Sequence, residues 1–337
     1  HLSIRRQRQM CIRDSNSAIG SSALLVNSTG AGNTALGAFA LDANTTADDN
    51  VAIGHNALTD STTAASNVAV GKNAAANITT GGSNVAVGRS SLSQQTTAAN
   101  NTAIGYEALT ANTTGDLNVA VGSGAMPSNT TGVQNTALGQ GALNANTTAS
   151  YNTAVGRAAL LVNTTGASNT AVGKGALDAN TTGSDNVGVG ALALSANTTA
   201  SNNVAVGRSA LEANTTGDRN TAIGYQALKT NTVGDRSVAV GYSALYTQNP
   251  ATNADMANVA IGNLSMYYTT TGTNNTGVGF NTMFANTTGA SNVAVGYGAL
   301  DANTTADDNT AVGYNAATTN TTGTNNAAFG AYALGLN

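Results

Sequence analysis

The sequence is poor in the residues that build most disulfide frameworks, metal sites and enzyme centres. Its 337 residues include one cysteine, two histidines, two prolines and no tryptophan, and only 8% are charged. The single cysteine, Cys11, excludes an intrachain disulfide and a cysteine-based metal site. No stretch approaches eighteen apolar residues, so the sequence predicts no membrane-spanning helix. An excess of acidic residues also disfavours an anionic membrane surface, so no direct membrane contact is expected.

The remaining polar residues form no recognisable reactive group. His55 is the only histidine outside position 1, so no triad or zinc cluster can be built around it. Acidic pairs occur at Asp48-Asp49 and Asp307-Asp308, but they are too sporadic for a calcium-binding repeat. No phosphate-binding GxxxxGK[ST] motif occurs. We therefore expect no catalytic residue, no cofactor and no metal site, and we predict that the protein is not an enzyme.

What the sequence does contain is a glycine every seventeen residues. Nineteen copies of N-[TV]-A-[VI]-G-x-x-A-L-x-A-N-T-T-G-x-x follow one another, with a single step of twenty-one between Gly241 and Gly262. A period this short is typical of a solenoid, in which stacked units share one core. The fold prediction is all-β: a parallel β-solenoid of nineteen 17-residue coils. The repeated glycines are Gly20, Gly37, Gly54, Gly71, Gly88, Gly105, Gly122, Gly139, Gly156, Gly173, Gly190, Gly207, Gly224, Gly241, Gly262, Gly279, Gly296, Gly313 and Gly330.

Positions within a coil are counted from this glycine as zero. Position −1 is always apolar and mostly β-branched, and position +4 is nearly always Leu or Met. We predict that both rows point inward and that each coil holds two short strands and two turns. Helical hairpins are excluded because Thr-Thr, Asn and Gly are poor helix formers.

Position −2 is Ala or Gly in every coil, as at Ala154, Ala171 and Ala205. Alternation along a strand would place this row on the face opposite position −1. Restriction to small residues there predicts a second chain packed against it, and so a homo-oligomer. The alternative is a thin roll whose interior admits only alanine on that side.

Asparagines recur in two rows, at position −4 (Asn50, Asn67) and at position +7 (Asn44, Asn112). Stacked coils would turn each row into a ladder of amide hydrogen bonds. Many asparagines of the second row begin Asn-Thr-Thr, which is also a formal glycosylation acceptor.

Two segments depart from the repeat. Residues 1–15 show no trace of it, and residues 5–14 resemble a translated sequencing adapter, so we expect a non-native leader. The chain is then expected to be an internal fragment, with residues 16–337 forming one β-solenoid domain. Extra residues near 246–253, including Pro250, should bulge as one loop without changing the stack.

The charge balance without the leader is acidic. Residues 1–15 hold four of the twelve basic and one of the sixteen acidic residues, which leaves a net charge of −7 for the remainder. Nucleic acid is therefore not an expected partner, because phosphate binding needs clustered Lys and Arg.

Position +1 carries large and variable side chains that we predict to be exposed. This stripe is basic in its first half and aromatic in its second, and aromatic rows can stack on sugars or bind partners. The alternative is that these side chains vary only because they are exposed to solvent and bind nothing. The candidate binding residues are Lys72, Arg89, Tyr106, Arg157, Lys174, Arg208, Tyr225, Tyr242, Phe280, Tyr297 and Tyr314.

The unit Asn-Thr-Ala-Ile-Gly-Tyr-Glu-Ala-Leu at 101–109 resembles the repeats of trimeric autotransporter adhesin heads (YadA-like head repeats). It is also similar to repeat regions of bacterial and phage tail-fibre-like proteins. The resemblance spans 16–337 and implies a left-handed, trimeric parallel β-roll on a cell or virion surface. The unit here is longer than the usual adhesin-head repeat.

Together these observations predict a structural and adhesive segment of an extracellular fibre. Nineteen coils at ~4.8 Å would extend over roughly 90 Å. Its expected partners are further copies of the chain and a host surface, matrix protein or glycan. The alternative function is an ice-binding β-solenoid, since threonine is abundant, but valine at Val51, Val68, Val85 and Val119 interrupts the threonine row before Ala.

Overall fold

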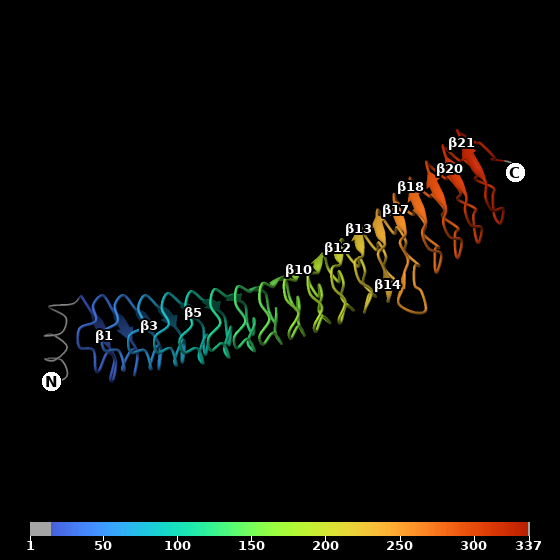
Figure 1. Ribbon diagram of the computed structural model, residues 1–337. Coiled ribbons are helices and arrows are strands. Elements are labelled where there is room, and N and C mark those ends of the chain that lie inside the picture. The colour runs from blue at the N-terminus through green and yellow to red at the C-terminus, as the bar shows by residue number, and fades with distance from the viewer. Residues whose placement is uncertain (1–14, 336–337) are drawn as a thin grey trace. The chain divides into compact units, whose positions relative to one another are not determined.

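The computed structural model describes residues 15–335, and every regular element in that range is a β-strand. The chain divides into two compact units, residues 1–165 and 166–337. In each unit, short strands are stacked coil on coil (Figure 1). The predicted leader lies outside the described residues, apart from Ser15.

The first unit contains nine strands of three residues each. They are β1 (Ser17–Ile19), β2 (Thr34–Leu36), β3 (Val51–Ile53), β4 (Val68–Val70), β5 (Val85–Val87), β6 (Thr102–Ile104), β7 (Val119–Val121), β8 (Thr136–Leu138) and β9 (Thr153–Val155).

The second unit continues the same series and adds a pair of two-residue strands, β14 (Gly234–Asp235) and β16 (Ala254–Asp255). Its other strands are β10 (Thr170–Val172), β11 (Val187–Val189), β12 (Val204–Val206), β13 (Thr221–Ile223), β15 (Val238–Val240), β17 (Val259–Ile261), β18 (Thr276–Val278), β19 (Val293–Val295), β20 (Thr310–Val312) and β21 (Ala327–Phe329).

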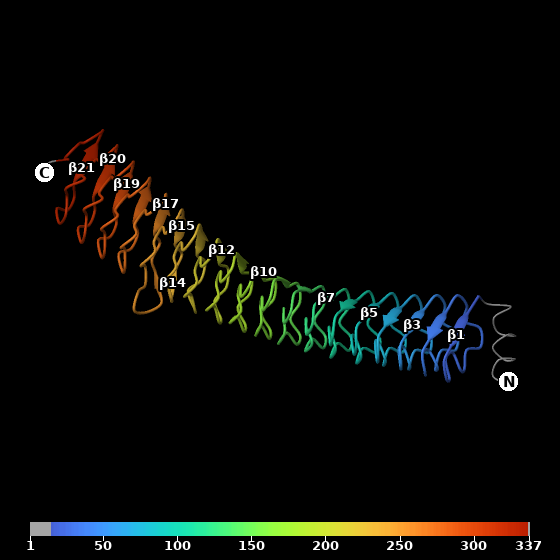
Figure 2. The same cartoon turned by 180° about the vertical axis from the view of Figure 1, so that it is seen from behind.

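Successive strands pair in parallel, and each residue pairs with its equivalent in the next coil. Thr34 pairs with Val51 in the first unit, and Val187 pairs with Val204 in the second. The predicted parallel β-solenoid of 17-residue coils is confirmed. Across the 21-residue step, Val238 still pairs with Val259, and the extra residues form a loop beside β14 (Figures 1 and 2).

Each coil contributes one strand to the ladder, so the prediction of two strands per coil is wrong. The return segment cannot be extended because it holds left-handed residues at +2 and +4, such as Asn56 (φ 55°) and Leu58 (φ 51°). It still bonds coil to coil: the Leu58 amide donates to the Ala74 carbonyl at 3.1 Å.

The core consists of the Leu or Met at +4 and the small residues at +3 and −2. Leu177, Ala176 and Ala171 are fully buried. The prediction that position −1 points inward is wrong, because Ile104 and Leu138 are 39% and 41% exposed. Val155, Val172 and Val189 are also only partly covered.

The thin-roll alternative is therefore correct for the alanine row. A Cβ added to Gly188, at position −2, would lie 3.4 Å from the Leu177 side chain and 3.3 Å from the Ala193 carbonyl oxygen. The interior is too narrow for anything larger than alanine. Ala154, Ala171 and Ala205 face this interior and do not form a surface for a second chain.

Both asparagine rows form the predicted ladders, and they lie inside the coil. The backbone amide of Asn50 donates to Asn33 Oδ1 at 2.9 Å, and the side-chain Nδ2 of Asn44 donates to Asn27 Oδ1 at 2.8 Å. The Ala47 carbonyl accepts from both Asn33 and Asn44, at 2.8 and 3.2 Å. Asn44 is fully buried, so its Asn-Thr-Thr sequence serves the ladder, and a sugar could not be attached there without opening the coil.

Candidate binding surface

The stripe at position +1 lies on the outer side of the turn that follows each strand. The repeated glycine has φ between 118° and 142°, and a Cβ there would approach the carbonyl of the next coil's glycine, at 2.3 Å for Gly224. This backbone turns the chain away from the sheet and directs the following side chain to solvent. All eleven predicted stripe residues are exposed, as expected.

In the first unit the stripe combines cations with one ring. The guanidinium carbon of Arg89 lies 5.5 Å from the centroid of the Tyr106 ring, within cation–π range. A hydrogen bond with the Glu107 side chain is the main cause that raises the pKa of the Tyr106 hydroxyl, and the negative charge of Glu107 raises it further. Lys72 and Arg157 are exposed at the same position of other coils, and His55 is exposed with its ring 6.0 Å from Phe39 and edge-on to it.

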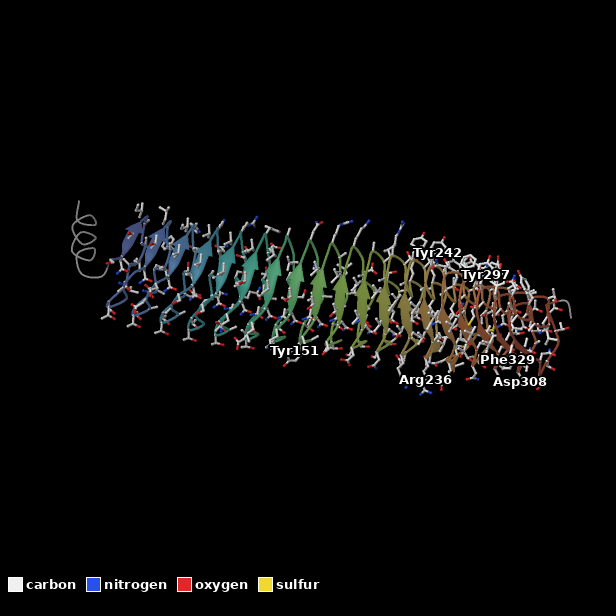
Figure 3. All side chains as sticks on the ribbon, turned by 90° about the horizontal axis from the view of Figure 1, so that it is seen from above. Tyr151, Arg236, Tyr242, Tyr297, Asp308 and Phe329 are labelled. Atoms are coloured by element: carbon white, nitrogen blue, oxygen red, sulfur yellow. The ribbon has the colours of Figure 1, made fainter. Side chains whose placement is uncertain are left out.

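In the second unit the stripe begins with the exposed Lys174 and Arg208 and is mostly aromatic from Tyr225 onward, with Asn263 between two runs of stacked rings. Tyr225 and Tyr242 stack with centroids 5.5 Å apart. Phe280, Tyr297 and Tyr314 form a second run, with centroid distances of 5.3 and 5.2 Å. Figure 3 shows Tyr242 and Tyr297 along one edge of this unit and Arg236 and Asp308 along the other.

A second aromatic row, at position +5, was not predicted. Tyr246, Tyr267 and Phe284 stack in successive coils at 5.0 and 5.6 Å, and Tyr268 packs edge-on against Tyr267 and Phe284. Burial, together with the neighbouring Tyr246, Tyr268 and Tyr242, raises the pKa of Tyr267. Three aromatic residues at the same repeat position were the signal that could have revealed this row.

Acidic side chains elsewhere on the coils accept hydrogen bonds from backbone amides of the preceding coil. Asp48 Oδ1 accepts the Ala31 amide at 2.7 Å, and Asp307 does the same for Ala290. Arg236 pairs with Asp255 at 2.5 Å. Within residues 15–335, no three His, Cys, Asp or Glu side chains are grouped so that they could hold a metal ion.

No helix in this described range is long and apolar enough to cross a membrane. In comparison with known proteins, no protein-family model matches the chain and no curated protein matches it.

Proposed function

We propose that this chain is a structural and adhesive segment of an extracellular fibre, without catalysis, that works as a homo-oligomer. The supporting observation is the outer face of the sheet. Every strand of the ladder presents Ser, Thr, Val or Ala at position −3 and Ile, Leu, Val or Phe at position −1. No charged side chain interrupts this face, although both of its rows remain partly or fully exposed.

This face is large enough to carry an association. Complete burial of a Val or Ile side chain contributes about 1.5–3 kcal/mol, which at ~25 cal/mol per Å² corresponds to about 60–120 Å² of apolar surface. Covering the exposed half of each side chain would therefore remove roughly 30–60 Å² from solvent. The nine coils of the first unit then offer on the order of 500–1,000 Å², which spans the ~800 Å² that each partner buries in a standard interface. A trimer, as in the adhesin heads that the repeat resembles, is the assembly that we propose. We therefore assign the contact between copies of the chain to the sheet face, in place of the alanine row expected from the sequence.

Adhesion can be tested with beads coated with the purified chain. We expect them to attach to host-cell layers, matrix-protein films or polysaccharide films more strongly than albumin-coated beads. Beads carrying the unfolding variant Leu177→Asp should lose this attachment. Attachment no greater than that of albumin on every surface would contradict the adhesive function.

A second candidate is ice binding at the same outer face. Position −3 carries only Thr or Val between the first and last strands, and these two side chains have nearly the same shape. Valine therefore changes the polarity of the row but not its contour, at a spacing of ~4.8 Å. A thermal hysteresis measurement separates the candidates, because only an ice-binding face would depress the freezing point below the melting point.

A further inference from the structure

The aromatic residues of this chain are concentrated on one edge of the second unit. The sequence contains ten tyrosines and four phenylalanines. Ten of these fourteen residues belong to the +1 and +5 rows or adjoin them in the turns of residues 225–332. A large exposed patch of this kind marks an interaction site more often than chance exposure. Its members are Tyr225, Tyr242, Tyr246, Tyr267, Tyr268, Phe280, Phe284, Tyr297, Tyr314 and Tyr332.

The stacking leaves ring faces available to a ligand. Parallel rings in van der Waals contact lie about 3.5–4 Å apart. The centroids of Phe280, Tyr297 and Tyr314 are 5.2–5.3 Å apart, with interplanar angles of 15–16°. This centroid separation exceeds the contact distance, so the stacked rings do not cover one another completely. Tyr242 and Tyr297 are 50% and 48% exposed.

The charge around this edge favours a neutral ligand. The charged residues from Tyr225 to Tyr314 are Lys229, Asp235, Arg236, Asp255, Asp301, Asp307 and Asp308. Lys229 and Asp301 occupy position +5 on either side of the ring row, where Lys229 pairs with Glu212 and Asp301 accepts a hydrogen bond from the Thr318 hydroxyl. Asp235 and Asp255 pair with Arg219 and Arg236, and Arg236 lies on the edge opposite Tyr242 and Tyr297 (Figure 3). Lys229, Asp235, Arg236, Asp255 and Asp301 thus each have a partner, and no run of like charge accompanies the rings for an anionic or cationic polymer to follow.

We propose that this aromatic edge binds a neutral linear polysaccharide lying along the stack of coils. Within each run a ring recurs at the coil spacing, with Asn263 between the run ending at Tyr242 and the run starting at Phe280. A ligand that repeats as the protein does can therefore use several equivalent contacts at once. Pyranose rings present apolar C–H faces to the open aromatic faces and hydroxyls to the tyrosine hydroxyls. This inference rests on the adhesive function proposed above and names the ligand class for it.

The test uses the full chain and four neutral polysaccharides, hydroxyethylcellulose, glycol chitin, laminarin and dextran, with heparin and alginate as anionic comparisons. Affinity electrophoresis measures retardation by each polymer. Tyrosine emission follows titration with the corresponding oligosaccharides, because the chain has no tryptophan and eight of its ten tyrosines belong to the patch. We expect at least one polymer to bind, and Tyr242→Ala with Tyr297→Ala to weaken its binding about tenfold.

The matched control is Tyr151→Ala, which removes a 59% exposed tyrosine outside the patch and should leave binding unchanged. Circular dichroism melts verify that each variant is folded. Absence of binding to all four polymers, equal binding by the double variant, or binding only to heparin or alginate would overturn the proposal. If coated beads still attach to cells or protein films in those cases, the adhesive function stands while the glycan assignment falls.

Discussion

At the scale of the residue, this fold is decided by how little space lies inside the coil. Position −2 faces the +3 and +4 side chains, and its size must match theirs. At Gly277 the +3 residues are Ser265 and Thr282, whose hydroxyls are hydrogen-bonded to each other at 2.6 Å. A Cβ at Gly277 would lie 2.8 Å from Ser265 Oγ and 3.0 Å from Thr282 Oγ1. The two larger +3 side chains therefore leave no room for a methyl group at Gly277.

This complementarity predicts different outcomes for two glycine substitutions at position −2. Gly277→Ala should lower the free energy of unfolding by about 1–3 kcal/mol, because the added methyl group overpacks the interior. Gly188→Ala should change it by less than about 1 kcal/mol, because the contacts there are 3.3–3.4 Å and alanine restricts the unfolded chain. Urea unfolding followed by circular dichroism measures both. Equal losses would show that the interior is more adaptable than its geometry indicates.

A second pair of variants tests which side chains are inside. Leu177→Asp places an unpaired charge in the fully buried +4 row and should destabilise its unit by several kcal/mol. Arg157→Asp changes an exposed +1 residue and should alter stability by less than about 0.5 kcal/mol. Thermal melts of the two variants beside the unmodified chain make the comparison. Similar melting temperatures for both variants would refute the assignment of these rows.

At the scale of the coil, the interior has an apolar half and a polar half. Alanine and leucine fill the first, and the two asparagine ladders converge on one row of backbone carbonyls in the second, as at Ala47. These backbone carbonyls keep their hydrogen bonds only where each coil supplies an asparagine side-chain amide. Where Ser61 replaces asparagine at +7, the Oδ1 atom of Asn44 in the preceding coil is buried without a hydrogen-bond partner.

The ladder predicts the effect of removing one rung. Asn129 Nδ2 donates to Asn112 Oδ1 at 2.9 Å and to the Gly132 carbonyl at 3.0 Å. Asn129→Ala would leave Asn112 Oδ1 buried without its donor, at a loss of about 1–3 kcal/mol. Thr131→Ala, at an exposed position two residues later, serves as the control and should be nearly neutral. Amide hydrogen exchange should also show faster opening of the coils next to residue 129 in the first variant, and unchanged protection there would contradict the ladder's role.

At the scale of the whole molecule, stability is a sum over neighbouring coils, and association depends on what the coils leave uncovered. Within each unit the interior is closed by the coils themselves, so no second chain is needed to bury the alanine row. The uncharged sheet face and the aromatic edge are separate outer surfaces. One can hold further copies of the chain while the other remains open to a ligand.

The sheet face predicts the oligomeric state and its sensitivity to charge. Light scattering should give a mass three times the 33.1 kDa of the chain. Val189→Lys with Ile223→Lys should reduce it to the monomer mass, because a lysine buried at an interface without a partner is unfavourable. Thr182→Lys with Thr216→Lys adds the same charge at exposed turn positions and should preserve the oligomer. A monomeric unmodified chain at micromolar concentration would contradict the association.

The sequence by itself determined the period, the parallel stack, the Leu row, the asparagine ladders and the exposure of the +1 stripe. These follow from repetition, because a residue type that returns every seventeen positions must meet its own copy in the next coil. Only the tertiary structure decided which side of the strand is inside. Alternation separates Val155 from Ala154 but does not say which faces inward, and hydrophobicity favoured the valine. The left-handed return segment lies so close to the strand that only alanine fits between them, and the larger β-branched residues are left outside. The +5 aromatic row likewise became visible only when stacking brought Tyr246, Tyr267 and Phe284 together.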